Sequence, residues 1–258
     1  MPLSDTPSVP NATIPIFQQS LGSWRLRLER TPFDRPSLAQ HYDRAAQSWQ
    51  RRIERLGMGR AYARLVRQML RHAPNLNAGP NVHALDCGIG TGALSVALAR
   101  ALPGRAQIEG VDVSPAMLAA ARARLAPSHA LQGTSLADIR ALPHAAGQFD
   151  LTMAAHVVEH VACPQDALAE MVRVTRPGGR IMLCLTRRSI LGLFVQARWR
   201  THGFRPAEVA PLLRSVGLLE VQRLSSGSRL FDAFSTAWVA TKPDDRKAEH
   251  QPARWPIG

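Results

Sequence analysis

Short apolar runs typical of strands alternate with apolar residues at helical spacing along residues 82–241 of this chain. Short apolar runs predict strands at Val82–Leu85, Ile108–Val113, Phe149–Ala154, Arg180–Leu185, Leu218–Leu224 and Phe234–Thr241. Apolar residues at helical spacing predict helices at Ala93–Leu102, Pro115–Leu125, Gln165–Val174 and Pro206–Val216. Strands and helices that alternate in this way favour an α/β fold, with helices on both faces of a mostly parallel sheet.

The chain divides into segments of different character. Residues 1–36 contain six prolines and no persistent period, so we expect a flexible leader there. Residues 37–80 have helical spacing and predict an N-terminal helical cap. The main domain is expected over residues 81–243, with an arginine-rich insertion at 187–205. The polar tail, 244–258, is expected to be flexible.

The composition fits one large α/β domain or two small ones. The 258 residues are 45% hydrophobic and 20% charged, and no apolar run approaches the roughly 18 residues that a transmembrane helix needs. The N-terminus has no basic segment followed by an apolar one, so no signal peptide is expected. Three cysteines are too few for a disulfide framework, and we expect a cytoplasmic location.

The formal net charge of +13 comes almost entirely from arginine, which supplies 30 of the 32 basic residues. Residues 1–80 hold 12 arginines against five acidic residues, and residues 187–229 hold eight against two, whereas residues 81–186 are neutral. A GC-rich genome also favours arginine, so the total charge is weak evidence of a partner. The distribution is more informative, because the excess lies in two segments that flank a neutral centre.

A glycine-rich turn follows the first predicted strand of the main domain and opens its first helix. Gly88, Gly90 and Gly92 leave no Cβ between the backbone and a ligand at the carboxyl ends of the strands. Asp112, twenty residues after Gly92, can accept hydrogen bonds from both hydroxyls of a ribose. Asp86, two residues before the first glycine, suits an ammonium group and would repel a pyrophosphate. The pattern favours S-adenosylmethionine over a dinucleotide, and a tight turn that binds nothing is the third alternative.

These motifs resemble those of the class I S-adenosylmethionine-dependent methyltransferases, in particular the branch that includes the ubiquinone and menaquinone methyltransferases. Residues 88–92 resemble the first motif of the family, residues 110–114 the ribose-binding strand end and residues 137–143 the adenine-binding loop. The resemblance implies a Rossmann-like, doubly wound sheet of seven strands. It also implies that Asp138 lies near the adenine amino group and Ile139 against the ring. Further cofactor contacts that it implies are Val113, Met117 and Ala155.

Three residues after the predicted strand at Phe149–Ala154 are candidates for the chemistry. His156, Glu159 and His160 follow this strand, where the fold lines its methyl-transfer pocket, and histidine is the default general base near neutral pH. The alternative for His156 is a solvent-facing residue at a helix start. The run from His156 to His160 also matches a zinc-peptidase motif, which we attribute to chance. Some quinone O-methyltransferases bind a divalent ion here, but His156 replaces the first acidic ligand, so we expect no metal.

The two flanking segments are expected to form the acceptor side. Tyr42 and Trp49 share one stripe of the cap, and Tyr42 either reaches the methionine carboxylate of the cofactor or simply packs. The segment 187–205 mixes apolar residues with arginines such as Arg198 and Arg200. That mixture suits an anionic amphiphile or an anionic membrane surface, or else a basic surface that faces only solvent.

The sequence thus predicts a methyltransferase that uses S-adenosylmethionine to methylate an O, N or C atom of a small-molecule or lipid-like acceptor. No Asn-Pro-Pro-aromatic run follows the strand before His156, which argues against methylation of the amino group of adenine or glutamine. Aromatic residues are only 5% of the chain, and no basic–aromatic interleaving indicates a surface on which bases would stack. Two alternatives stay open. One is an RNA methyltransferase, which the net charge favours, and the other is a non-catalytic scaffold or sensor that binds S-adenosylmethionine.

Overall fold

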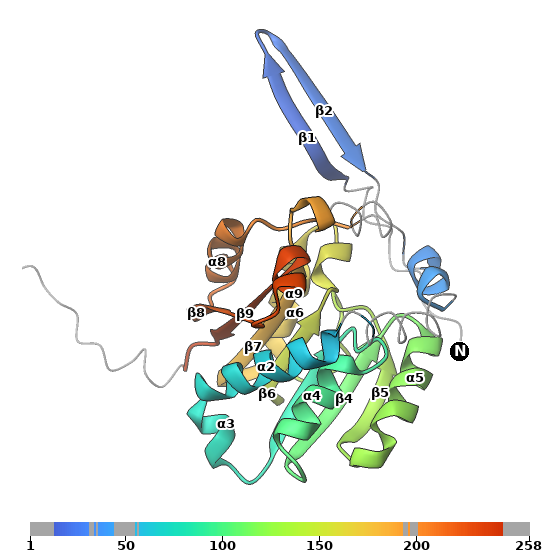
Figure 1. Cartoon of the computed structure of the whole chain (residues 1–258), viewed down its shortest axis with the longest axis vertical. Coiled ribbons are helices and arrows are strands. Elements are labelled where there is room, and N and C mark those ends of the chain that lie inside the picture. The colour runs from blue at the N-terminus through green and yellow to red at the C-terminus, as the bar shows by residue number, and fades with distance from the viewer. Residues whose placement is uncertain are drawn as a thin grey trace, which may run out of the picture.

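The computed structural model describes residues 13–30, 34, 36–43, 55, 57–192, 196 and 201–244. Its body is a single sheet with helices on both faces (Figure 1). The strands of the sheet are β3 (Val82–Cys87), β4 (Ala106–Asp112), β5 (Leu131–Leu136), β6 (Phe149–Ala155), β7 (Thr175–Thr186), β8 (Leu219–Leu224) and β9 (Ser235–Thr241). The predicted α/β class is therefore confirmed.

The spatial order of the seven strands is β5-β4-β3-β6-β7-β9-β8. The neighbours from β5 to β7 pair in parallel, whereas β9 runs antiparallel to both β7 and β8. The chain order reverses between β3 and β6, because β4 and β5 lie on one side of β3 while β6 and β7 lie on the other. In an open parallel sheet a ligand binds at the carboxyl ends of the strands beside such a reversal.

Helices cover both faces of the sheet and bury its apolar side chains. Their bounds are α2 (Met58–Arg71), α3 (Pro74–Ala78), α4 (Ala93–Ala101), α5 (Pro115–Leu125), α6 (Pro164–Val174), α8 (Pro206–Ser215) and α9 (Arg229–Phe234), with short 3₁₀ turns η1 (Ala126–Ser128) and η2 (Val158–His160). Alternate residues of β3 face opposite sides: Ala84 packs in the core with α2, α4 and α5, and Leu85 packs in the core with α6 and α8. This alternation follows from the two-residue period of a strand.

The predicted helical cap is present in two described pieces. Residues 36–43 and α2 are helical. The turn-rich linker expected after α2 contains the short helix α3. Trp49 lies outside the described residues, as do Arg198, Arg200 and the tail from residue 245. None of the helices within the described ranges is long and apolar enough to cross a lipid bilayer.

The prediction of a flexible leader is wrong for residues 14–30. They form an antiparallel hairpin of β1 (Ile14–Leu21) and β2 (Trp24–Arg30) that projects from the body of the molecule (Figure 1). Gly22 and Ser23 form its two-residue turn, and Gly22 has a φ of 61°. A glycine in this position is typical of tight hairpins. The scattered prolines obscured this signal in the sequence.

Candidate active site

The glycine-rich turn connects β3 to α4 at the carboxyl edge of the sheet. Gly88, Gly90 and Gly92 have φ values of 76°, 53° and 75°, a backbone region that residues with a Cβ rarely adopt. A Cβ on Gly88 would also lie 2.3 Å from Cγ2 of Val157, in the loop that follows β6. By contrast, a Cβ on Gly90 would meet no atom within 4 Å. The turn therefore packs closely on its β6 side and leaves open space above Gly90.

Asp112 ends β4 and faces this turn. The backbone N–H of Gly90 donates to Oδ2 of Asp112 at 2.9 Å, and the N–H of Ser114 donates to Oδ1 at 2.9 Å. Burial raises the pKa of Asp112, and these backbone hydrogen bonds oppose the rise. Each carboxylate oxygen can accept more than one hydrogen bond, so both retain capacity for a hydroxyl of a ligand. Asp112 therefore fits the predicted ribose contact.

Asp86 lies one residue before the end of β3 and is 1% exposed. The hydroxyl of Ser95, on α4, donates to its Oδ2 at 2.6 Å. The pKa of Asp86 is raised to about 7, chiefly by burial; the hydrogen bond from Ser95 lowers the pKa, and the nearby Asp112 contributes to the rise. Burial disfavours the ionised form of a carboxyl group, but a cation that binds beside the group stabilises that form. The site thus fits the ammonium group of an amino-acid moiety.

The expected adenine-binding residues follow β5. The N–H of Ala137 donates to the carbonyl oxygen of Asp112 at 3.1 Å, so this loop begins beside the expected ribose site. Ile139 is buried. The carboxylate of Asp138 forms a bidentate ion pair with the guanidinium of Arg140, with N···O distances of 2.7 and 3.0 Å. Sequence reasoning missed Arg140, which holds Asp138 in place. Val113 and Ala155 are half-buried, and Met117 is buried.

His156 follows β6 directly and has a φ of 60°, which is unusual for a residue other than glycine. Its backbone N–H donates to the carbonyl oxygen of Cys184 on β7 at 2.8 Å, which fixes this conformation. Its Nδ1 lies 3.2 Å from Oε1 of Glu159 and 3.1 Å from Oγ1 of Thr186. Unusual backbone conformations of this kind cluster at functional sites.

Glu159 orients the imidazole from a buried position. Its Oε1 accepts hydrogen bonds from the N–H of Thr186 at 3.1 Å and from the hydroxyl of Thr186 at 2.7 Å. Burial by itself raises the pKa of Glu159, but the interactions with His156, His160 and Thr186 outweigh it and lower the pKa overall. Because a carboxylate oxygen only accepts, a hydrogen bond between His156 and Glu159 places the proton on Nδ1, and Nε2 is then the nitrogen with a lone pair.

Two aromatic side chains of α9 lie near the imidazole of His156. The rings of Phe231 and Phe234, on α9, each lie 6.5 Å from the imidazole between centroids. Oγ of Ser235 lies 3.4 Å from Nε2, and the His156 side chain is 18% exposed. These residues were not predicted, because α9 is short and its relation to β6 depends on the pairing of β9 with β7.

The N-terminal helix 36–43 closes over the same edge of the sheet. The hydroxyl of Tyr42 lies 2.8 Å from Nε2 of His160, and the hydroxyl of Ser114 donates to the carboxylate of Asp43. Burial lowers the pKa of His160 to about 4, and the nearby Glu159 opposes this shift. Tyr42 and Asp43 therefore bridge the ends of β4 and β6 across the candidate site.

The three catalytic candidates thus separate into two groups. His156 and Glu159 form one hydrogen-bonded pair, whereas His160 belongs to the cap contact with Tyr42. Over the described ranges, no three His, Cys, Asp or Glu side chains are arranged to hold a metal ion. The expectation of metal-free chemistry stays a prediction.

Comparisons with known proteins relate this site to one family. Residues 85–183 match the family model described as a methyltransferase domain. A demethylmenaquinone methyltransferase from Mycobacterium tuberculosis is 33% identical over 162 residues, which cover 62% of this chain and 62% of that relative. A crystal structure of an S-adenosylmethionine-dependent methyltransferase from Thermotoga maritima is similar with a TM-score of 0.58 and 20% identity, over 80% of this chain and 99% of that one. The [4+2]-cyclase SpnF is similar with a TM-score of 0.57 and 21% identity, over 70% and 81% of the two chains.

The two structural neighbours support the fold alone, since their identity to this chain is low. One of them is described as a cyclase, which illustrates that this fold carries more than one chemistry. The chain spans about three fifths of the length of the mycobacterial relative. The activity of the whole protein must therefore be argued from the site.

Proposed function

We propose that the chain is an S-adenosylmethionine-dependent methyltransferase with a small-molecule acceptor, and that residues 85–183, which match the methyltransferase-domain family model, form part of its catalytic domain. The observation that carries the proposal is the meeting of three groups at one edge of the sheet. These are the buried carboxyl group of Asp86, the Asp112 carboxylate beside the glycine turn, and the pair formed by His156 and Glu159.

The residues of β3 and β4 would hold the cofactor at its two polar ends. Asp86 would receive the ammonium group and Asp112 the ribose hydroxyls, while the open space above Gly90 admits the ligand between them. Ile139 and Met117 would contact the adenine side. When bound, S-adenosylmethionine supplies a methyl group that is activated for transfer by its positively charged sulfur.

His156 would serve as the general base for a hydroxyl-bearing acceptor. Glu159 holds the Nδ1 side of the ring, and Nε2, which lies 3.4 Å from the hydroxyl of Ser235, would take the proton that the acceptor hydroxyl loses. Removal of that proton increases the electron density of the acceptor at the atom that takes the methyl group. Glu159 stabilises the imidazolium that results, because its carboxylate is buried and close to the ring. His160 would act through Tyr42 on the cap rather than on the acceptor.

The acceptor that fits best is an aromatic hydroxyl compound of the quinol class. Phe234 offers a half-buried apolar ring beside His156, on which a flat ring can stack, and the buried ring of Phe231 packs against Phe234. The mycobacterial relative is named for a quinone substrate, which supports the same class. Contact of residues 187–205 with an anionic acceptor or membrane stays a prediction. A cytoplasmic location is part of the proposal and is supported by the free thiols Cys87, Cys163 and Cys184.

The test is a methyl-transfer assay on the purified full chain with a naphthoquinol that lacks its ring methyl group. Release of S-adenosylhomocysteine and a product heavier by one methylene group would be measured together. His156→Gln is expected to lower kcat by about 100-fold, since general base catalysis contributes 10² to 10⁴ in rate. Affinity for S-adenosylhomocysteine should change little. His83→Gln is the matched control, because His83 is exposed near the amino end of β3.

Two results would contradict the proposal. Tight binding of S-adenosylhomocysteine without turnover on any hydroxylated aromatic acceptor would favour a non-catalytic scaffold. Full kcat in a folded His156→Gln variant would remove this residue from the chemistry, although the cofactor assignment would stand.

A further inference from the structure

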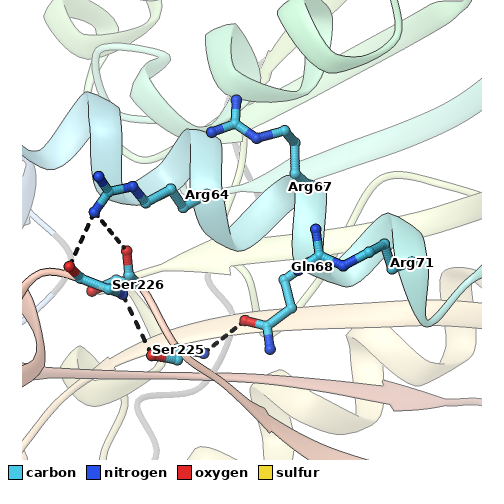
Figure 2. Close-up of a pocket in the computed structure, with 7 residues that line it drawn as sticks. Arg64, Arg67, Gln68, Arg71, Ser225 and Ser226 are labelled. Atoms are coloured by element: carbon cyan, nitrogen blue, oxygen red, sulfur yellow. Dashed lines mark hydrogen bonds between the residues drawn. The ribbon is translucent and has the colours of Figure 1, made fainter.

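A concave surface lies between α2 and the turn that connects β8 to α9, away from the candidate active site. It is open to solvent, has a volume of about 370 Å³ and is lined by polar and basic side chains (Figure 2). Arg64, Arg67 and Arg71 contribute from the helix, and residues 225–227 contribute from the turn. None of its lining residues belongs to the cofactor or acceptor groups described above.

The arginines on α2 share one face of the helix. Arg60, Arg64, Arg67 and Arg71 follow one another at intervals of four, three and four residues, and all are exposed. The helix contains no acidic residue, and no acidic side chain lines the pocket. Like charges at such intervals destabilise a helix. Within the described ranges, none of these guanidinium groups forms an ion pair with a carboxylate, so the face lacks a counter-charge.

Hydrogen bonds between α2 and the turn at residues 225–227 shape the pocket before any ligand binds. The guanidinium of Arg64 donates to the carbonyl oxygen of Gly227 at 3.0 Å, and Oε1 of Gln68 accepts from the N–H of Ser225 at 2.8 Å. Figure 2 shows both contacts, with Arg67 and Arg71 extending from the same helix without a bond to the other residues drawn. The hydroxyl of Ser226 is directed at Asp232 instead, at 2.8 Å. The helix and turn are therefore tied together while two guanidinium groups remain available.

We propose that this pocket binds a small ligand that carries two or more phosphate groups. Guanidinium groups match phosphate oxygens in pairs, and the three arginines span about 10 Å along the helix, which suits a diphosphate better than a single monoanion. The volume of this open pocket is within the usual range for small-molecule sites. No aromatic side chain lines the pocket, so it lacks a platform on which bases of a nucleic acid would stack.

The proposed site is distinct from the methyl-transfer site and does not depend on the proposed activity. The ring of Tyr62, on the inner face of α2, packs at 5.9 Å from Phe231, and Phe231 in turn lies 6.5 Å from His156. These two buried aromatic residues separate the arginine face of α2 from the candidate base.

The test is calorimetric titration of the full chain with inorganic pyrophosphate, without any methyl acceptor. The double variant Arg67→Gln/Arg71→Gln is expected to weaken pyrophosphate binding at least tenfold. The control Arg100→Gln/Arg214→Gln removes the same charge from exposed positions on α4 and α8 and should stay within twofold of wild type. Both variants should bind S-adenosylhomocysteine normally, which shows that the fold is intact. Orthophosphate and vesicles containing an anionic phospholipid distinguish a free diphosphate from a lipid headgroup.

Several outcomes would overturn the proposal. Equal losses in the two double variants would mean that pyrophosphate responds to total charge rather than to this pocket. Absence of pyrophosphate binding at millimolar concentration and low salt would exclude the site. Binding of an RNA oligonucleotide that depends on Arg67 and Arg71, without pyrophosphate binding, would identify a nucleic-acid surface instead.

Discussion

The substitution Asp86→Asn should make the ligand-free protein more stable at neutral and alkaline pH while it weakens cofactor binding. Asp86 is 1% exposed and its pKa is raised to about 7, chiefly by burial. Asparagine has nearly the same shape, and its Oδ1 can still accept the hydrogen bond from Ser95. The change therefore removes an ionisable group without opening a cavity.

The sign and size of the effect follow from proton linkage. Between pH 4 and pH 7 the folded protein keeps the Asp86 proton that the unfolded chain has already lost, so the free energy of unfolding falls as pH rises. A pKa raised from about 4 to about 7 corresponds to at most ~4 kcal/mol, at 1.36 kcal/mol per pH unit. The loss is absent below pH 4 and complete above pH 7. Asp86→Asn lacks this loss and should unfold at higher temperature than wild type at pH 8.

The assay is thermal or denaturant unfolding of both proteins between pH 4 and pH 8, together with calorimetric titration of S-adenosylhomocysteine at pH 8. The variant should gain about 2–4 kcal/mol at pH 8 and lose at least tenfold in affinity, because the ammonium group no longer meets a carboxylate. Asp166→Asn, at an exposed position in the first turn of α6, is the control and should change stability by less than about 1 kcal/mol. Equal stability of wild type and Asp86→Asn at pH 8 would refute the argument.

Three further outcomes are expected. Asp112→Ala should weaken S-adenosylhomocysteine binding ten- to a hundredfold by calorimetry, since hydrogen bonds worth about 1.5–3 kcal/mol are lost, and unchanged affinity in a folded variant would contradict the ribose assignment. Gly88→Ala should lower the free energy of unfolding by about 1–3 kcal/mol in denaturant titrations, because its Cβ would lie 2.3 Å from Val157 at a φ of 76°, and a loss below about 0.5 kcal/mol would count against that packing. Methyl transfer should survive a chelator, whereas activity that disappears and returns with one divalent ion would show that His156 and Glu159 work with a metal.

The main domain could be predicted from sequence because its signals are local. Strand and helix periods identified six of the seven strands of the sheet, and Ser114 caps α5 as its position before Pro115 predicted. The missed strand, β5, has the sequence LQGTSL, and its residues are only partly buried at the sheet edge. It is a strand because β4 offers hydrogen-bonding groups beside it, and the sequence of β5 alone contains no sign of that neighbour.

The composition of the candidate site depended much more on tertiary structure. The sequence determined the glycine turn, Asp86, Asp112 and the cluster after β6, because each is defined by its distance from a neighbouring element. Only the folded chain decided that Tyr42 binds His160 across 118 positions. It also decided that Glu159 faces His156 with Thr186 of β7. Such contacts depend on which strands become neighbours, and pairing between distant segments leaves no periodic trace in either one.

The arginines of α2 illustrate the same division. Their spacing, readable from the sequence, places them on one face of a helix, but a charged face is most often solvated. Only the tertiary structure placed the turn at residues 225–227 against that face and tied Arg64 and Gln68 to it. A pocket forms where two elements meet at a fixed distance. The sequence therefore determined the charge of this helix face, whereas the packing of α2 beside β8 decided that the charged side chains line a pocket.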